Sequence, residues 1–410
     1  MSFTQVSPPA IFLQSLTNTA GEHQNQMFIS KTSMLSPKME PQILSKTSIK
    51  SAQKPSTNND TSKSDSPEKD SNIVFYDDYT RCDVSSENII TVGGRKSILA
   101  VVQSKCIASE LHTACPLHSF PVVALSTLGD LVQGKPLYSF GGKSLWTKEL
   151  ETLMLGQYEN LPKIDIIVHS LKDMPTALPE GCILGAITER EDPRDAVVMK
   201  ASSPYVHLRD LPHGSVVGTS SIRRSAQLKK NFPHLVFESV RGNVQTRLRK
   251  LDDPSSKFSC IILAVAGLNR LGLGHRITSC LDAPDMYYAV GQGALGIEIR
   301  SSDEKVKELL EKISHKETYL KCLAERSLLR TLEGGCSVPI GVKTSFISPG
   351  NLEFTGIVVS VDGTEYVNET VTGKVTTDKE ANELGELLAK RLIENGAKKI
   401  LDQIHLDQIK

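Results

Sequence analysis

The feature that most constrains the fold is a unit that occurs twice: a short apolar run, a turn of small residues, and a basic residue near the start of a helical pattern. In the first copy, IITVG leads into GGRKS and a helical pattern over residues 97–111. In the second copy, a strand ending at residues 216–217 leads into GTSS and a helix over residues 222–230. Strands that alternate with helices favour an α/β fold with a largely parallel sheet. The shared pattern also indicates two similar domains.

The rest of the ordered chain continues this alternation. The run IDIIVH (164–169) is typical of a strand buried on both faces of a parallel sheet. The segments FESVRGNVQTRLRKL and CIILAVAGLNRLGL each predict a further strand followed by a helix or loop, and GQGALGIEIR predicts a late strand. The loop at Gly141 and Gly142 is either a lid or a plain connection. Towards the C-terminus, LEFTGIVVSV and ELGELLAKRLIENGAKKIL predict a small α+β domain.

Residues 1–85 differ from the rest of the chain. They are rich in Ser, Thr, Asn, Gln, Lys and Pro and contain almost nothing to bury. Such a composition cannot offset the entropy lost on folding, so we expect a disordered extension.

Composition excludes several classes of protein. Lysine plus arginine and aspartate plus glutamate both total 47, so an anion site must come from local clusters and not from bulk charge. No stretch is long and apolar enough to span a bilayer, and the eight cysteines form no C-x-x-C pair. Zinc-protease, Walker and dinucleotide-binding motifs and G-x-S-x-G are also absent. The sequence therefore indicates a soluble protein of a reducing compartment without a metal site.

Basic residues gather just after the predicted strands. Nearly all of a set of six, with Arg270 as a seventh candidate, fall in loops or first helical turns there: Arg95, Lys172, Arg223, Arg224, Arg241 and Arg247. In an open α/β sheet this is the ligand-binding edge, where helix N-termini present free N–H groups. Because the planar fork of arginine matches a carboxylate, we predict a cleft for a substrate with several carboxylates. Solvated surface charges are the alternative for any single residue. Nucleic-acid binding is disfavoured because no aromatic side chains interleave to stack on bases.

One acidic residue, Asp173, stands among these bases at the end of the run IDIIVH. Pro175 biases Met174 towards extended geometry and so helps to fix the loop that carries Asp173. A carboxylate beside cations stays ionised, so it would stabilise a developing positive charge better than it would donate a proton. An aspartate that caps a helix or forms a salt bridge is the alternative.

The stretch LEGGCSVPIGV places Cys336 just after a helical pattern over residues 318–332. Gly334 and Gly335 end the helix and Pro339 prevents its resumption, so Cys336 should lie on a loop. A thiol at the C-terminal end of a helix meets the negative end of the helix dipole, which disfavours a thiolate nucleophile. A small buried hydrophobe is the alternative on position alone.

Seven motifs, taken together, resemble the porphobilinogen deaminase family. They occur in the family's order: VGGRKSILAVVQ, VHSLKDMPTALPEG, VGTSSIRRSAQL, RGNVQTRL, AVAGLNRLGL, GQGALGIE and LEGGCSVPIGV. The resemblance covers about residues 88–410 and leaves the N-terminal extension without a counterpart. One departure is Gly94, where many members have Thr before the residue that matches Arg95.

The resemblance implies a fold of two similar α/β domains, like those of periplasmic binding proteins, and a C-terminal α+β domain that bears the cofactor cysteine. The GQGALGIE strand would return to the first domain. The implied boundaries are 1–85 for the disordered extension, 86–188 with 290–312 for the first α/β domain, 189–289 for the second, and 313–410 for the C-terminal domain.

The resemblance also implies a role for each matching residue. Cys336 would hold a dipyrromethane cofactor, made from two substrate molecules, through a thioether, and Asp173 would stabilise the cation formed as ammonia leaves. The cofactor's acetate and propionate groups would be bound by Lys172, Ser221, Arg223 and Arg224. The incoming pyrrole and growing chain would be bound by Arg95, Ser97, Arg241, Arg247 and Arg270, with Gln103 and Gln292 near the same cleft.

The implied activity is that of a transferase in haem biosynthesis. It would condense four porphobilinogen molecules head to tail, with loss of ammonia, to give linear hydroxymethylbilane, primed by the covalent dipyrromethane. The alternative is a non-catalytic two-domain protein that closes on a polycarboxylate. We expect a cytoplasmic monomer with no nucleic-acid partner, no membrane association and no metal.

Overall fold

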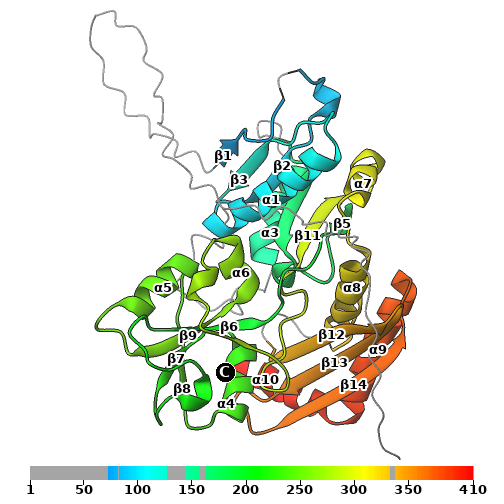
Figure 1. Cartoon of the computed structure of the whole chain (residues 1–410). Helices are drawn as coiled ribbons and strands as arrows, with labels where there is room; N and C mark the ends of the chain where they lie inside the picture. Colours follow the sequence, from blue (N-terminus) through cyan, green and yellow to red (C-terminus); the bar gives the residue numbers. More distant parts are fainter. Residues whose placement is uncertain (1–72, 82, 127–143, 157–162, 333–337, 410) are drawn as a thin grey trace, which may run out of the picture. The chain divides into compact units, whose positions relative to one another are not determined.

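The computed structural model describes residues 73–81, 83–126, 144–156, 163–332 and 338–409 (Figure 1). Three features singled out in the sequence lie outside these ranges: Cys336, the glycines that precede it, and the candidate lid at Gly141 and Gly142.

Six strands form the first sheet. Their order is β1 (Ile73–Tyr76), β3 (Val122–Leu125), β2 (Val92–Arg95), β4 (Ile166–Ser170), β11 (Leu295–Arg300) and β5 (Cys182–Ile187). Strand β2 runs parallel to β3 and β4, whereas β11 is antiparallel to β4 and β5. Strand β11 therefore returns from late in the chain to the first sheet, which confirms the prediction for GQGALGIE.

Five strands form the second sheet. Their order is β10 (Ser279–Leu281), β6 (Asp195–Met199), β9 (Phe258–Ala264), β7 (Val216–Gly218) and β8 (Val236–Glu238). Their directions repeat those of the first sheet. Strand β7 is parallel to β8 and β9, as β2 is to β3 and β4, and β6 is antiparallel to β9 and β10, as β11 is to β4 and β5. This repetition confirms the prediction of two similar α/β domains.

The helices that follow β2 and β7 begin in the same way. Helix α1 (Ile98–Ala114) and helix α4 (Ile222–Asn231) each have a serine N-cap, Ser97 and Ser221. The hydroxyl oxygen of each serine accepts a hydrogen bond from the backbone N–H three residues on, at 3.4 Å. These caps satisfy N–H groups that a helix start leaves unpaired. The other helices that the structure describes in the α/β domains are α3 (Ser144–Met154), α5 (Val244–Asp252), α6 (Val265–Arg270) and α7 (Glu304–Glu311).

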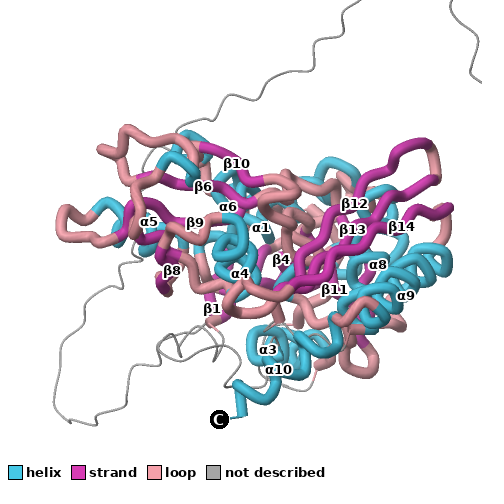
Figure 2. The backbone as a smooth tube through the Cα atoms, turned by 90° about the horizontal axis from the view of Figure 1, so that it is seen from below, coloured by secondary structure: helices cyan, strands magenta, loops and turns pink. Residues whose placement is uncertain are grey.

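The C-terminal part is an α+β unit, as predicted. Its antiparallel strands are β12 (Ile340–Ser348), β13 (Asn351–Val359) and β14 (Tyr366–Lys374), and its helices are α8 (Lys316–Thr331), α9 (Asp378–Glu394) and α10 (Ala397–Ile409). Helices α8 and α9 lie side by side against the sheet (Figure 2). They approach closely because Gly385 has no side chain: a Cβ atom there would lie 2.4 Å from the carbonyl oxygen of Ala324.

Strand β1 corrects the expected limit of the N-terminal extension. It lies within residues 1–85 but pairs antiparallel with β3, and Ile73 and Tyr76 pack against the apolar clusters of the first domain. The expectation of disorder is therefore wrong for residues 73–76. Composition averaged over a long polar segment hides a four-residue apolar run whose partner lies about 50 residues away in the sequence.

Candidate active site

Asp173 lies at the end of β4 on a short 3-10 turn, Leu171–Asp173. Leu171 and Met174 on either side are almost fully buried, whereas Asp173 is exposed. The backbone N–H of Leu171 donates to the carbonyl of Ala294 at 3.0 Å. Met174 has the extended geometry predicted from Pro175, with φ −82° and ψ 134°. The turn therefore anchors two apolar side chains and presents the carboxylate between them.

Six charged residues act electrostatically on one another around this turn. We call them the Asp173 cluster: Lys172, Asp173, Asp195, Arg223, Arg224 and Arg247. Its four cations outnumber its two carboxylates. Such an excess of positive charge, in partly desolvated surroundings, favours the binding of anions.

Burial lowers the pKa values of three cations of the Asp173 cluster: Lys172, Arg247 and Arg223. Burial lowers the pKa of the Lys172 ammonium to about 8; Asp173 partly opposes this change and Arg224 adds to it. Burial also lowers the pKa of the Arg247 guanidinium to about 10, again with Arg224 acting in the same direction and Asp173 against it. A carboxylate ligand would lower the free energy of the charged forms of these side chains.

Arg223 and Arg224 are buried and share one carboxylate, that of Asp195. Arg223 Nη1 donates to Asp195 Oδ2 at 2.8 Å, and Arg224 Nη2 donates to Asp195 Oδ1 at 2.7 Å. Arg223 Nη1 also donates to the carbonyl of Tyr287 at 2.7 Å, and Arg224 Nη1 to that of Ile262 at 3.0 Å. The two guanidinium groups are therefore held in place by the protein itself.

Sequence reasoning missed Asp195. Burial raises its pKa, but the adjacent guanidinium groups of Arg223 and Arg224 outweigh this and hold the pKa far below the usual range of an aspartate. The available signal was an acidic residue at the start of an otherwise apolar strand, DAVVM. A fully buried aspartate in such a strand requires a cationic partner.

The two glutamines hold backbone and side chains of the site. Gln292 Nε2 donates to the carbonyl of Pro193 at 2.6 Å and to Asp195 Oδ1 at 2.9 Å, and its Oε1 accepts from Lys172 Nζ at 3.4 Å. Gln103 Nε2 donates to Ser170 Oγ at 2.7 Å, at the start of the Asp173 turn. These contacts favour a supporting role over direct substrate binding for both glutamines.

The structure also describes the other predicted arginines and one further contact of Arg247, a member of the Asp173 cluster. Arg95 ends β2 and is half-buried. Arg241 Nε donates to Ser239 Oγ at 3.4 Å. Arg270 Nη2 donates to the carbonyl of Gly293 at 2.7 Å, and the acidic residues that act on its side chain are Glu191 and Glu110. Arg247 Nε donates to the carbonyl of Gly242 at 2.7 Å.

A second ion pair that the sequence did not reveal joins Arg190 to Glu325. Arg190 Nη1 donates to Glu325 Oε1 at 2.6 Å, and Arg190 Nη2 to Oε2 at 3.1 Å. Arg190 Nε also donates to the carbonyl of Gln292 at 2.7 Å. Glu325 lies on α8 and accepts the backbone N–H of Gly291 at 2.8 Å. Both segments that connect the two α/β domains are therefore tied to helix α8.

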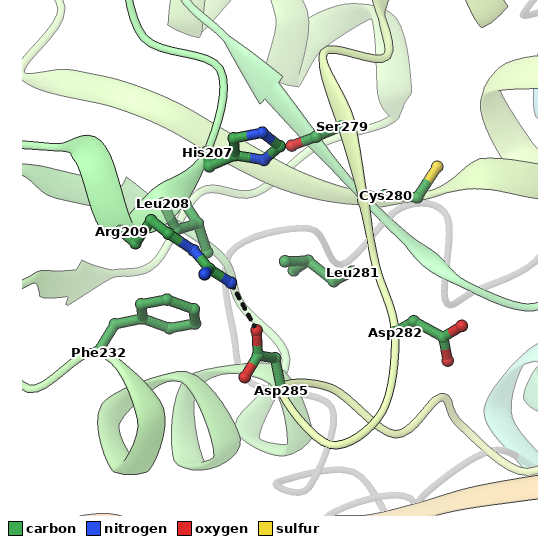
Figure 3. Close-up of a pocket in the computed structure, with 9 residues that line it drawn as sticks. All are labelled: His207, Leu208, Arg209, Phe232, Ser279, Cys280, Leu281, Asp282 and Asp285. Atoms are coloured by element: carbon green, nitrogen blue, oxygen red, sulfur yellow. Dashed lines mark hydrogen bonds and ion pairs between the residues drawn. The ribbon is translucent and has the colours of Figure 1, made fainter.

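A small pocket elsewhere does not involve the predicted site. It lies beside β10 and is lined by residues that include His207, Phe232 and Cys280 (Figure 3). An ion pair between Arg209 and Asp285 crosses it at 3.4 Å.

In the described ranges, no group of His, Cys, Asp or Glu side chains could hold a metal ion. In the same ranges, no helix is long and apolar enough to cross a membrane.

Two family models match the chain. The model described as "Porphobilinogen deaminase, dipyromethane cofactor binding domain" matches residues 90–308, and "Porphobilinogen deaminase, C-terminal domain" matches residues 319–394. Among curated proteins, the chain is 63% identical over 321 residues to a porphobilinogen deaminase of Yarrowia lipolytica, covering 78% of this chain and 95% of the relative. The corresponding proteins of Candida albicans and Saccharomyces cerevisiae are 58% and 55% identical, over 79% and 78% of this chain and 95% and 98% of the relatives.

Proposed function

The chain belongs to the porphobilinogen deaminase family, and from this premise we propose which residues carry the family's reaction. The enzyme condenses four porphobilinogen molecules head to tail, with loss of ammonia at each step, to give linear hydroxymethylbilane. It uses a dipyrromethane cofactor, which when bound supplies the pyrrole to which the first substrate is joined. The matching relatives carry the name of this enzyme, and nothing favours the alternative of a non-catalytic binding protein.

The residues of the Asp173 cluster fit a group that carries several carboxylates. Lys172, Arg223 and Arg224 would hold the acetate and propionate groups of the cofactor, with Ser221 at the cap of the helix that carries both arginines. Asp195 fixes the two guanidinium groups before the cofactor binds, so little side-chain entropy is lost on binding. Substrate and growing chain would be bound by Arg95, Ser97, Arg241, Arg247 and Arg270.

We place Cys336 as the attachment point of the cofactor through a thioether. It falls between the end of α8 at Thr331 and the start of β12 at Ile340, in a motif that matches the family's cofactor loop. A permanent tether does not require the lowered pKa of a nucleophilic thiolate.

The observation that carries the proposal for Asp173 is an exposed carboxylate, on a turn with a buried underside, beside two cations whose pKa values are lowered. When the bond to the leaving ammonia breaks, positive charge develops on the substrate pyrrole. A carboxylate fixed beforehand stabilises that charge without having to reorganise.

We also propose the division into 86–188 with 290–312, 189–289 and 313–410, with β1 added to the first domain because it pairs with β3. A cytoplasmic monomer without nucleic-acid or membrane partners remains our proposal for the whole protein. Equal numbers of basic and acidic residues, 47 of each, support the part of this proposal that concerns nucleic acid and membrane surfaces.

The test of the proposal is the Asp173→Asn variant. Asparagine keeps the size of the side chain but removes its charge, so the cofactor should still attach while ammonia release slows by roughly 100-fold or more. Cofactor attachment is measured by the mass of the intact protein, and ammonia release by a single-turnover assay with porphobilinogen. Near-normal ammonia release in this variant would remove Asp173 from the mechanism.

A further inference from the structure

A buried arginine of helix α8 holds the backbone that follows Asp173. The Arg326 side chain donates from Nη1 to the carbonyl of Met174 at 3.4 Å, and from Nη2 to those of Pro175 at 2.6 Å and Thr176 at 3.3 Å. Only 4% of Arg326 is exposed. One guanidinium group therefore gathers three consecutive carbonyl groups of the loop that begins directly after Asp173.

This arrangement is unusual for a buried cation. Buried arginines are normally paired with carboxylates, because an uncompensated charge is costly to desolvate. Among the described residues, the ion pairs of Arg190, Arg223 and Arg224 follow this rule, whereas no ion pair of Arg326 is found. Burial lowers the pKa of Arg326 to about 10, so the group is still charged at neutral pH. The carbonyl groups of the loop are its hydrogen-bond partners.

The same face of α8 also supports the underside of the Asp173 turn. Leu171 and Met174 form one apolar cluster with Cys322, which lies one helical turn before Arg326. Tyr319 packs against the same cluster, one further turn back along α8. The turn is therefore held by apolar contacts at its base and by Arg326 at its C-terminal side.

The hydrogen bonds of Arg326 hold a segment that has no regular secondary structure. Residues 174–181 lie between the 3-10 turn and β5 and form neither helix nor strand. Pro175 and Pro179 have no N–H group to donate. A planar guanidinium can satisfy several carbonyl groups in one fixed geometry, which a lysine ammonium cannot do equally well.

We propose that Arg326 is a positioning residue: by binding the carbonyl groups of residues 174–176, it sets the position of the Asp173 carboxylate relative to helix α8. Arg326 does not touch the reacting atoms and acts through Asp173. This inference rests on the proposed role of Asp173. Helix α8 ends at Thr331, five residues before Cys336 in the sequence, so the same helix that leads to the tether would also align the carboxylate.

The test compares the holoenzymes of Arg326→Met, Arg326→Lys and a control, Arg330→Met. Arg330 lies one turn further along α8, is exposed and donates to Asn382 Oδ1 at 2.9 Å. For each variant, the rate of ammonia release is divided by the cofactor-loaded fraction, which is measured by intact mass. We expect kcat to fall by about 10- to 100-fold in Arg326→Met with little change in KM, because a displacement of about 1 Å is enough for such a loss. The kcat of Arg326→Lys should lie between those of Arg326→Met and the wild type, and the kcat of Arg330→Met should match that of the wild type.

A double-mutant cycle separates positioning from a general structural role. If Arg326 acts through Asp173, Arg326→Met should slow the Asp173→Asn enzyme by less than about twofold. The inference would be overturned if Arg326→Met lowered the kcat of the Asp173→Asn enzyme by the same factor as that of the wild type. An unchanged kcat in Arg326→Met alone would also overturn it. If Arg326→Met does not fold, the same cycle with Arg326→Lys decides. Failure of Asp173→Asn alone to slow the reaction would instead contradict the proposed function.

Discussion

At the scale of single residues, the site depends on charges that the protein has already arranged. Asp195 is fully buried and orients Arg223 and Arg224, while Gln292 connects Asp195 to Lys172. Fixed dipoles and charges of this kind act on a ligand without the cost of reorganisation. The side chains that would bind the ligand and the side chains that hold them in position therefore both belong to the site.

Replacement of Asp195 by asparagine should strongly destabilise the protein. The variant leaves two guanidinium groups buried without their shared carboxylate, and the loss of one partner of a buried ion pair typically costs about 3–5 kcal/mol. The free energy of unfolding in urea measures this effect. The control is Asp285→Asn, since the pair of Asp285 with Arg209 is largely exposed and should contribute about 0–1 kcal/mol. Equal stability of the two variants would show that the buried pair is not needed.

The lowered pKa of Lys172 predicts a pH dependence of cofactor loading. Its folded-state pKa of about 8 lies below the usual 10.5, so as the pH rises through about 8 the unliganded protein loses the ammonium charge. Attachment of a carboxylate-bearing cofactor should then slow in the wild type. In Lys172→Arg the charge persists to higher pH, so the decline should move to more alkaline values. To measure both pH profiles, cofactor-free wild-type and Lys172→Arg proteins are incubated with porphobilinogen at a series of pH values. The mass of the intact protein then gives the extent of cofactor loading. Identical pH profiles would exclude Lys172 as the titrating group.

At the scale of elements, the strand, turn and helix unit seen in the sequence is the structural repeat of the molecule. Strands β2 and β7 occupy equivalent positions in their sheets, and the helices that follow them, α1 and α4, each begin with a serine N-cap. In the first unit, Gly94 of β2 lies so close to α1 that a side chain there would require Ser104 to move. A Cβ atom there would lie 2.3 Å from Ser104 Oγ of α1.

This packing predicts a compensating pair of substitutions. Gly94→Ala should destabilise the protein by about 1–3 kcal/mol through overpacking. Ser104→Ala should be close to neutral, because the Ser104 hydroxyl is buried and has no hydrogen-bond partner among the described residues. In the double variant the cost of Gly94→Ala should largely disappear, since the nearest remaining atom would be the Cβ of residue 104 at 3.6 Å. Thermal unfolding of the four proteins tests this, and additive effects would contradict it.

The elements and the site were predictable from the sequence to different extents. Local patterns sufficed for the repeat and for the position of Asp173 after a buried strand, whereas the family resemblance implied the return of the late strand. They did not reveal that Asp195 pairs with Arg223 and Arg224, 28 and 29 residues away, or that Arg190 pairs with Glu325, 135 residues away. Such partners have no spacing signal, because they are brought together only by the tertiary fold. Strand β1 was missed for the same reason.

At the scale of the whole molecule, helix α8 links the parts on which the reaction depends. Through Glu325 it holds both segments that connect the α/β domains, and through Arg326 it holds the loop after Asp173. It then leads towards Cys336. We propose that one chain carries its own primer at Cys336 and presents it to the residues around Asp173.

The mass of the intact protein tests this claim most directly. The wild-type chain, purified and then incubated with a limiting amount of porphobilinogen, should be heavier than its sequence by two linked pyrroles and should show further discrete additions of one pyrrole each. Cys336→Ala should show neither the primer nor the additions, while Asp173→Asn should show the primer with slow additions. A wild-type protein that releases ammonia and forms the tetrapyrrole at its unmodified mass would contradict the account.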